Sequence, residues 1–185
     1  MATIILKNVR VAFPDLFQAR QFEGSGPFTY GATFLMEPGS EAALLAAKTI
    51  KEVAKEKWAA KSDDVLKSFG TNNQKVCLYP GDQKEYDGFA GMVALSCKRQ
   101  QEAGHPKVVD QKLNELSSTD GKPYGGSYVN AKVDLWAQEN KWGKGIRATL
   151  IAVQFVKDGD AFTANGPASA EGFGEEEEND ASGLL

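Results

Sequence analysis

The strongest constraint on the fold of this 185-residue chain is a pair of alternating segments near its C-terminal end. Residues 127–138 read SYVNAKVDLWAQ and residues 146–156 read IRATLIAVQFV, with the segment ENKWGKG between them. Alternation of apolar and polar residues is typical of a strand with one buried face, and two such strands around a Gly-containing turn predict a β-hairpin. In the first strand, the side chains expected to face a core are those of Val129, Ala131, Val133, Leu135 and Ala137.

The N-terminal half predicts two more strands, over residues 3–13 and 28–37. Pro14 is expected to end the first of them, so residues 15–27 are predicted to form a loop. Residues 41–58 are rich in Ala, place apolar residues at helical spacing and follow Ser40 as an N-cap, which predicts one prominent helix. The remaining expected elements are a short helix over 63–68, a short strand over 75–79, a strand over 92–100 and an extended piece around 108–109.

This order of elements favours a small barrel, because strands and helices do not alternate as they would in a doubly wound sheet. We expect a mainly β protein: a five-stranded Greek-key barrel of the OB type, with one helix after the second strand and long loops. Periodicity is lost after the segment KDGD at residues 157–160, so we predict one domain over residues 1–162 and a disordered tail over residues 163–185.

Charge is distributed unevenly between these two parts. Residues 1–157 carry 21 Lys and Arg against 17 Asp and Glu, whereas residues 158–185 carry eight acidic residues and no basic ones. Such a split indicates a body that binds a polyanion and a tail that regulates binding or recruits partners, although a tail kept only for solubility is the alternative. The tail residues proposed for these roles are Glu175, Glu176, Glu177, Glu178, Asp180, Leu184 and Leu185.

Little in the sequence points to catalysis. His105 is the single histidine, and no phosphate-binding glycine motif is present. Cys77 and Cys97 form no CxxC motif and are interpreted as reduced thiols of a cytosolic protein, and no stretch of the sequence is long and apolar enough for a membrane span. Asp82, Glu85 and Asp87 do not have the spacing of a calcium loop, so we expect no enzyme activity, cofactor or metal; a metal-dependent nuclease using these three carboxylates is a minor alternative.

The second face of the segment 127–138 is more informative. It carries Tyr128, Lys132 and Trp136, and the turn that follows adds Lys141, Trp142, Lys144 and Arg147. Aromatic rings beside cations are typical of a surface that stacks on bases and contacts phosphates. Asp134 lies on the same face and opposes this interpretation. Alternatively, Trp136 and Trp142 cover a second small core.

Several of these segments resemble one family: bacteriophage single-stranded DNA-binding proteins with one OB fold and an acidic C-terminal tail. The resemblance is carried by LKNVRVAFPDLF, FTYGATFLMEPGS, GMVALSCKRQ with HPKVVD, and YGGSYVNAKVDLWAQENKWGKGIRATLIAVQFVKDGD. It implies sequence-independent binding of single-stranded DNA in the cytoplasm of an infected bacterium. It also implies contacts between the tail and phage or host replication and recombination proteins. Related tails commonly end on an aromatic residue, whereas this one ends on Leu184-Leu185.

Twelve residues make up the expected DNA-binding surface: Phe28, Tyr30, Lys98, Arg99, Lys107, Tyr128, Lys132, Trp136, Lys141, Trp142, Lys144 and Arg147. The alternative from another class is a structural or protein–protein adaptor module that docks through the tail. That alternative expects Trp136 and Trp142 to be buried.

Overall fold

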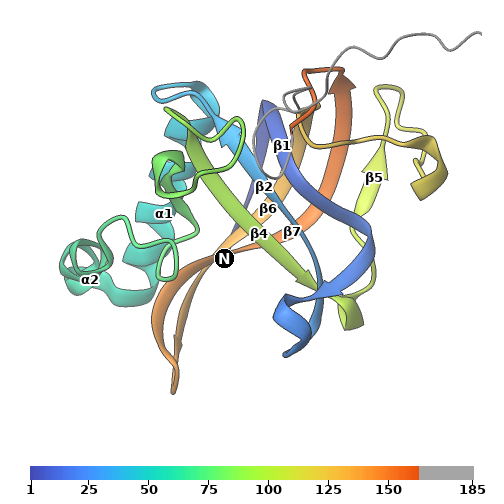
Figure 1. Ribbon diagram of the computed structural model, residues 1–185. Helices are drawn as coiled ribbons and strands as arrows, with labels where there is room; N and C mark the ends of the chain where they lie inside the picture. The colour runs from blue at the N-terminus through green and yellow to red at the C-terminus, as the bar shows by residue number, and fades with distance from the viewer. Residues whose placement is uncertain (163–185) are drawn as a thin grey trace, which may run out of the picture.

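A computed structural model of the chain describes residues 1–162 (Figure 1). Residues 163–185, which hold all of the predicted tail, lie outside the described part, so the predicted boundary at residue 162 stays a prediction. The strands are β1 (Ala2–Gln21), β2 (Phe28–Met36), β3 (Leu78–Pro80), β4 (Val93–Gln100), β5 (Lys107–Val109), β6 (Tyr128–Asn140) and β7 (Gly143–Lys157). The helices are α1 (Glu41–Trp58), α2 (Ser62–Phe69) and the short 3-10 turns η1 (Phe22–Gly24), η2 (Ala59–Lys61), η3 (Gly81–Gln83), η4 (Gln101–Ala103) and η5 (Ser118–Asp120).

Five of the strands close into a barrel. β1 pairs antiparallel with β2 and with β6, β2 pairs with β4, and β6 pairs with β7. A parallel pairing of β4 with β7, at Lys98 opposite Thr149, closes the ring. The order around the barrel is therefore β1-β2-β4-β7-β6, and the short strands β3 and β5 extend it at β4 and β7. The expected five-stranded OB-type barrel is confirmed, with two additional short strands.

The buried side chains of β6 are those that the alternating sequence predicted to face the core. Val129, Ala131, Val133 and Leu135 of β6 are completely buried, and Ala137 packs against the same cluster. The neighbouring strands contribute Leu6, Phe34, Leu95 and Leu150 to this cluster. Each strand thus gives alternate side chains to the interior, as a small barrel requires.

Helix α1 has the expected bounds and lies against β1 and β6 at one side of the barrel (Figure 1). The Ser40 side chain accepts a hydrogen bond from the Ala43 backbone N–H at 3.3 Å, which satisfies one free donor of the first turn. The apolar face that α1 buries includes Ala46, Ile50 and Val53. Helix α2 ends at Gly70, as expected from the sequence. No helix within residues 1–162 is long and apolar enough to cross a membrane.

The expected end of the first strand at Pro14 is wrong, because β1 continues through Pro14 to Gln21. The pairing of β1 with β2 is irregular between Ala12 and Asp15, and Phe13 has a positive φ of 50°. Such a bulge leaves residues out of the hydrogen-bonding ladder, so the missing N–H of Pro14 interrupts no regular pair. Residues 15–21, predicted as loop, are therefore the second half of a barrel strand.

The short strand expected over residues 75–79 is displaced, since β3 covers Leu78–Pro80. The segment around it forms a second, smaller core outside the barrel. Ala12, Leu35, Tyr79, Phe89 and Ala94 are buried together, with Met92 and Phe162 packed against them. We call this group the satellite core; it fixes the loop of residues 81–92 to the outer face of β1, β2 and β4.

Candidate nucleic-acid interface

The outer face of β2 and β4 forms the floor of an open groove. Thr33 pairs with Ser96 and Gly31 with Lys98 across the two strands, and Thr33 and Ser96 share a 3.0 Å hydrogen bond between their hydroxyls. These short side chains leave a concave space of about 470 Å³, which we call the outer groove. Its lining also includes Phe13, Asp15, Arg20, Gln21, Phe22 and Glu23 from β1 and η1.

Phe22 and Lys98 stand together at one side of the outer groove. Phe22 lies in the short turn after β1, and 72% of it is exposed. The Lys98 ammonium nitrogen is 5.9 Å from the centre of the Phe22 ring. An exposed ring of this kind gains nothing from burial within the protein, but it provides a flat surface on which a base can stack. Lys98 adds a positive charge beside that surface.

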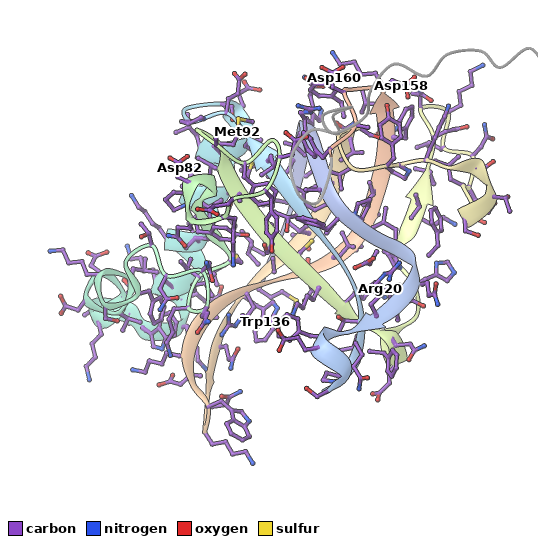
Figure 2. The ribbon with its side chains drawn as sticks, viewed as in Figure 1. Arg20, Asp82, Met92, Trp136, Asp158 and Asp160 are labelled. Atoms are coloured by element: carbon purple, nitrogen blue, oxygen red, sulfur yellow. The ribbon has the colours of Figure 1, made fainter. Side chains whose placement is uncertain are left out.

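Trp136 lies on the other side of Lys98. Thr149 of β7 is paired with Lys98 of β4, and the Trp136 indole N–H donates to the Thr149 hydroxyl at 3.0 Å. Figure 2 labels Trp136 near the lower half of β4. The indole is half-buried, so one part of it is fixed against β7 while the rest reaches solvent. The outer face therefore continues from the outer groove across β4 and β7 to β6.

The β6–β7 hairpin extends this face beyond the barrel (Figure 1). Trp142 at its tip is 78% exposed, and the Lys141 ammonium nitrogen lies 5.0 Å from its ring centre. Lys144 forms an ion pair with Glu139 at 3.5 Å. The hairpin tip thus repeats the combination found at Phe22 and Lys98, an exposed ring with a lysine beside it. The adaptor hypothesis expected Trp142 to be buried, which it is not.

Two arginines of the predicted surface are tied to the protein itself. Arg99 donates to the backbone carbonyls of Gly104 and Ala103, both at 2.8 Å, and to that of Leu150 at 3.3 Å. Arg147 donates to the Gln138 side chain and to the Gln74 carbonyl, both at 2.8 Å. These contacts use some of the five N–H donors of each guanidinium within the protein and fix its position, while its positive charge remains.

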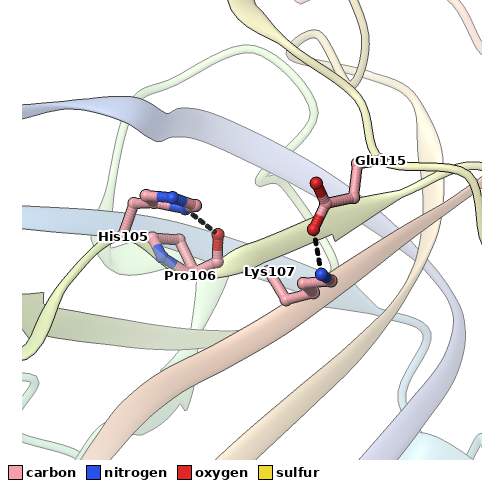
Figure 3. A network of polar contacts seen from close by, with 4 residues as sticks. All are labelled: His105, Pro106, Lys107 and Glu115. Atoms are coloured by element: carbon pink, nitrogen blue, oxygen red, sulfur yellow. Dashed lines mark hydrogen bonds and ion pairs between the residues drawn. The ribbon is translucent and has the colours of Figure 1, made fainter.

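Other predicted residues lie away from the outer groove. Lys107 on β5 forms an ion pair with Glu115, next to the contact between His105 and the Pro106 carbonyl (Figure 3). The Lys107 ammonium lowers the pKa of the Glu115 carboxyl, because it stabilises the charged form. The Tyr128 ring lies near the guanidinium of Arg10, 5.4 Å away, and the ammonium of Lys157, 4.6 Å away.

The last three predicted residues belong to the strands but not to the groove lining. Lys132 is exposed on β6. Phe28 is 48% exposed at the start of β2, and Tyr30 is half-buried on the same side of β2 as the core residues Ala32 and Phe34. A role in DNA binding stays a prediction for all twelve residues of the expected surface.

Sequence reasoning missed the residues that β1 brings to the outer groove, chiefly Phe13, Arg20 and Phe22. The available signal was the presence of Phe17 and Phe22 in a segment predicted to be a loop. Phe17 packs against the barrel core, which shows that this segment is part of the barrel, whereas Phe22 is exposed. Arg20 forms an ion pair with Asp15 at 2.6 Å inside the groove.

Asp82 and the two cysteine thiols occupy structural positions. Asp82 accepts a hydrogen bond from the Gly91 N–H at 2.9 Å, and within residues 1–162 no three His, Cys, Asp or Glu side chains are grouped to hold a metal ion. Cys77 and Cys97 are free and buried. Burial raises the pKa of the Cys77 thiol to about 12 and also raises that of Cys97, so both stay protonated and unreactive near neutral pH.

Two comparisons of the sequence find related phage proteins. The family model described as "Enterobacter phage Enc34, ssDNA-binding protein" matches residues 2–182. Protein p50 of Acyrthosiphon pisum secondary endosymbiont phage 1 is 44% identical over 172 residues, covering 92% of this chain and 91% of p50.

Two solved structures extend the comparison to the fold. The single-stranded DNA-binding protein of bacteriophage Enc34, in complex with single-stranded DNA, superposes with a TM-score of 0.70 at 25% identity, over 86% of this chain and 88% of that one. The gp2.5 single-stranded DNA-binding protein of bacteriophage T7 has a TM-score of 0.55 at 16% identity, over 95% of this chain and 100% of that one. At that identity, the likeness to gp2.5 concerns the fold alone.

Proposed function

Since this chain belongs to the family of the Enterobacter phage Enc34 single-stranded DNA-binding protein, we propose that it binds single-stranded DNA in phage DNA replication, recombination or repair. The single observation that best supports a specific surface is the pairing of exposed rings with lysines at both ends of one barrel face. Phe22 with Lys98 lies at one end, and Trp142 with Lys141 lies at the other. Trp136 lies between them, fixed by Thr149.

Base stacking on these rings contributes ~1–3 kcal/mol per base and requires bases that are free of a duplex stack. The floor of the outer groove consists of Thr33, Ser96 and Gly31, which are small and present no long side chain to read base edges. Every base has a π-face, so binding through such rings is independent of sequence. The lysines add phosphate contacts, and the affinity therefore falls as salt rises.

The acidic tail is proposed to regulate this surface in the cytoplasm of an infected bacterium. A segment with the four glutamates 175–178, tethered to a basic body, acts at a high effective concentration and competes with DNA for the lysines. When DNA displaces it, the terminal Leu184 and Leu185 become available to replication or recombination proteins. Support for this role comes from the charge of the tail and from the resemblance in chain organisation; the tail itself lies outside the described residues.

The test is a titration of tryptophan fluorescence with a dT oligonucleotide and with a duplex of the same length, at low salt. The chain has three tryptophans, and Trp58 is buried with its indole N–H donating to Glu139. We expect dT to quench the fluorescence of the wild type and of Trp58→Phe, and to quench Trp142→Phe much less. The duplex should have little effect on any of them.

A gel shift run in parallel measures binding independently of fluorescence. Absence of dT binding by the wild type in both assays would refute the proposed function. Binding of dT with unchanged quenching in Trp142→Phe would keep the function but remove the hairpin tip from the interface.

A further inference from the structure

Resting on the proposed function, we propose that Phe162 is a positioning residue for DNA binding. It lies outside the outer groove, yet it packs against the loop of residues 81–92, and that loop supports the ring of Phe13 in the groove wall. Phe162 would thereby fix the orientation of the Phe13 ring in the outer groove without lining that groove itself.

The first step is the attachment of residues 158–162, which we call the C-terminal strap, to the barrel. The Phe162 N–H donates to the Gly125 carbonyl at 2.8 Å. Arg10 donates to the Asp160 carbonyl at 2.6 Å, and the Gly159 N–H donates to the Tyr124 hydroxyl at 3.1 Å. Contact with residues 125–126 is so close that a Cβ on Gly126 would lie 2.1 Å from the Asp160 carbonyl oxygen. The strap is thus held by the segment that precedes β6 and by Arg10 of β1.

The second step is the placement of the Phe162 ring. It lies directly on Gly88, since a Cβ at that position would be 2.3 Å from the ring carbon Cε1. The guanidinium carbon of Arg10 is 4.2 Å from the ring centre. Phe162 also packs against the satellite core. The ring is therefore held between Arg10 of β1 and the backbone of the loop.

The third step leads from the loop to the outer groove. Phe89, one residue after Gly88, is buried in the satellite core, and its ring centre lies 5.4 Å from that of Tyr86. Tyr86 in turn meets Phe13 edge-to-face with ring centres 4.8 Å apart, and Phe13 lines the outer groove. Phe13 and Tyr86 are 43% and 42% exposed, so both side chains remain accessible to solvent.

The geometry of Phe13 depends on this support because of its backbone. Its positive φ at the bulge of β1 turns the side chain toward the loop, where Tyr86 and Phe89 hold it. Stacking needs a ring whose orientation is fixed before the base arrives, since ordering a free side chain on binding reduces affinity. Loss of the Phe162 ring would free one side of the loop and, through Tyr86, the Phe13 ring.

The test is a double-mutant cycle in the full chain, with Phe162→Ala, Phe13→Ala and the double variant, each titrated with dT below its melting temperature. We expect Phe162→Ala to weaken dT binding about tenfold in the wild-type background, the order of one stacked base. In the Phe13→Ala background the same change should weaken binding less than about twofold, because residues that act through one another are not additive. Phe162→Leu keeps apolar packing and should restore most of the affinity.

A matched control is Ala161→Ser, at an exposed position of the same strap. If Phe162→Ala lowers the melting temperature but leaves dT affinity unchanged, Phe162 is only a structural residue and the inference is wrong. Equal losses in both backgrounds would also contradict it. If Phe162→Ala does not fold, Phe162→Val, which keeps less of the ring's packing than Leu, is compared in the two backgrounds in the same way. Failure of the wild type to bind dT would instead contradict the proposed function.

Discussion

Lys98 and Arg99 are neighbours in sequence, carry the same charge and have different surroundings. The Lys98 side chain is exposed at the outer groove and lies near the Phe22 ring, whereas the Arg99 guanidinium donates to three backbone carbonyls. Because the Lys98 side chain donates to no backbone carbonyl within residues 1–162, its three N–H donors are available to a phosphate. Arg99 instead stabilises η4 through its hydrogen bonds. Alternation along β4 places the two side chains on opposite faces of the strand.

This difference predicts opposite phenotypes for two adjacent substitutions. Lys98→Gln should lower dT affinity and reduce the slope of log affinity against log salt by ~0.7, the value for one phosphate contact on a single strand, with little change in stability. Arg99→Gln should lower the free energy of unfolding by about 2 kcal/mol, because three hydrogen bonds are lost. Salt titrations and urea unfolding of both variants measure this; equal salt slopes would contradict the assignment of Lys98 to the interface.

At the scale of elements, α1 shows how a local signal fixes a boundary. Ser40 has an extended backbone and accepts from Ala43, Glu41 lies in the first turn, and Lys55 and Lys57 lie in the last. Each of these residues stabilises the first or last turn of a helix over residues 41–58, by accepting a hydrogen bond from a backbone N–H or by interacting with the helix dipole. Strand β1 shows the reverse, because its path through Pro14 depends on a bulge opposite β2.

Removal of the helix cap should therefore destabilise the barrel without altering its interface. Ser40→Ala is expected to lower the free energy of unfolding by ~1 kcal/mol, since the donors of the first turn lose a partner. Ser40→Asp should restore stability, because Asp accepts the same bond and suits the helix dipole. Urea unfolding followed by circular dichroism measures the loss, and dT affinity should be equal in all three chains. An unchanged midpoint in Ser40→Ala would show that the cap contributes nothing.

At the scale of the whole molecule, barrel closure determines which residues share the proposed DNA-binding surface, and the distribution of charge determines how that surface responds to salt. The contact of β4 with β7 brings the outer groove beside Trp136, so two surfaces from different halves of the chain become one. Residues 1–157 carry an excess of basic residues, whereas residues 158–185 carry eight acidic residues and no basic ones. Attraction between them is screened over a Debye length of about 8 Å at physiological salt.

A chain ending at Phe162 should accordingly bind dT more tightly than the full chain at low salt, and the difference should shrink as salt rises. Neutralising the tail by changing Glu175–Glu178 to Gln should reproduce the effect of truncation, because the charges rather than the length are responsible. Fluorescence or gel-shift titrations at two salt concentrations compare the three chains. Equal affinities at low salt would limit the tail to a role in partner binding.

The sequence by itself determined those features whose physical cause is local. Periodicity of two identified the buried face of β6, periodicity of 3.6 with a cap identified α1, and the Gly-containing turn identified the hairpin. The mixture of rings and cations around Trp142 was also visible, because that segment is continuous in sequence.

Only the tertiary structure decided which of those residues share a surface. Closure of β4 onto β7 and the contact of Phe162 with Gly88 join residues distant in sequence, and β1 continues through Pro14 because its later residues pair with β2. Sequence patterns report the face on which a side chain lies, but the register between strands fixes its neighbours, and register is a property of the whole barrel. For this reason the place of Phe13 and Phe22 in the outer groove was missed, as were the hydrogen bonds of Arg99 to the backbone; a role of Arg99 in DNA binding stays a prediction.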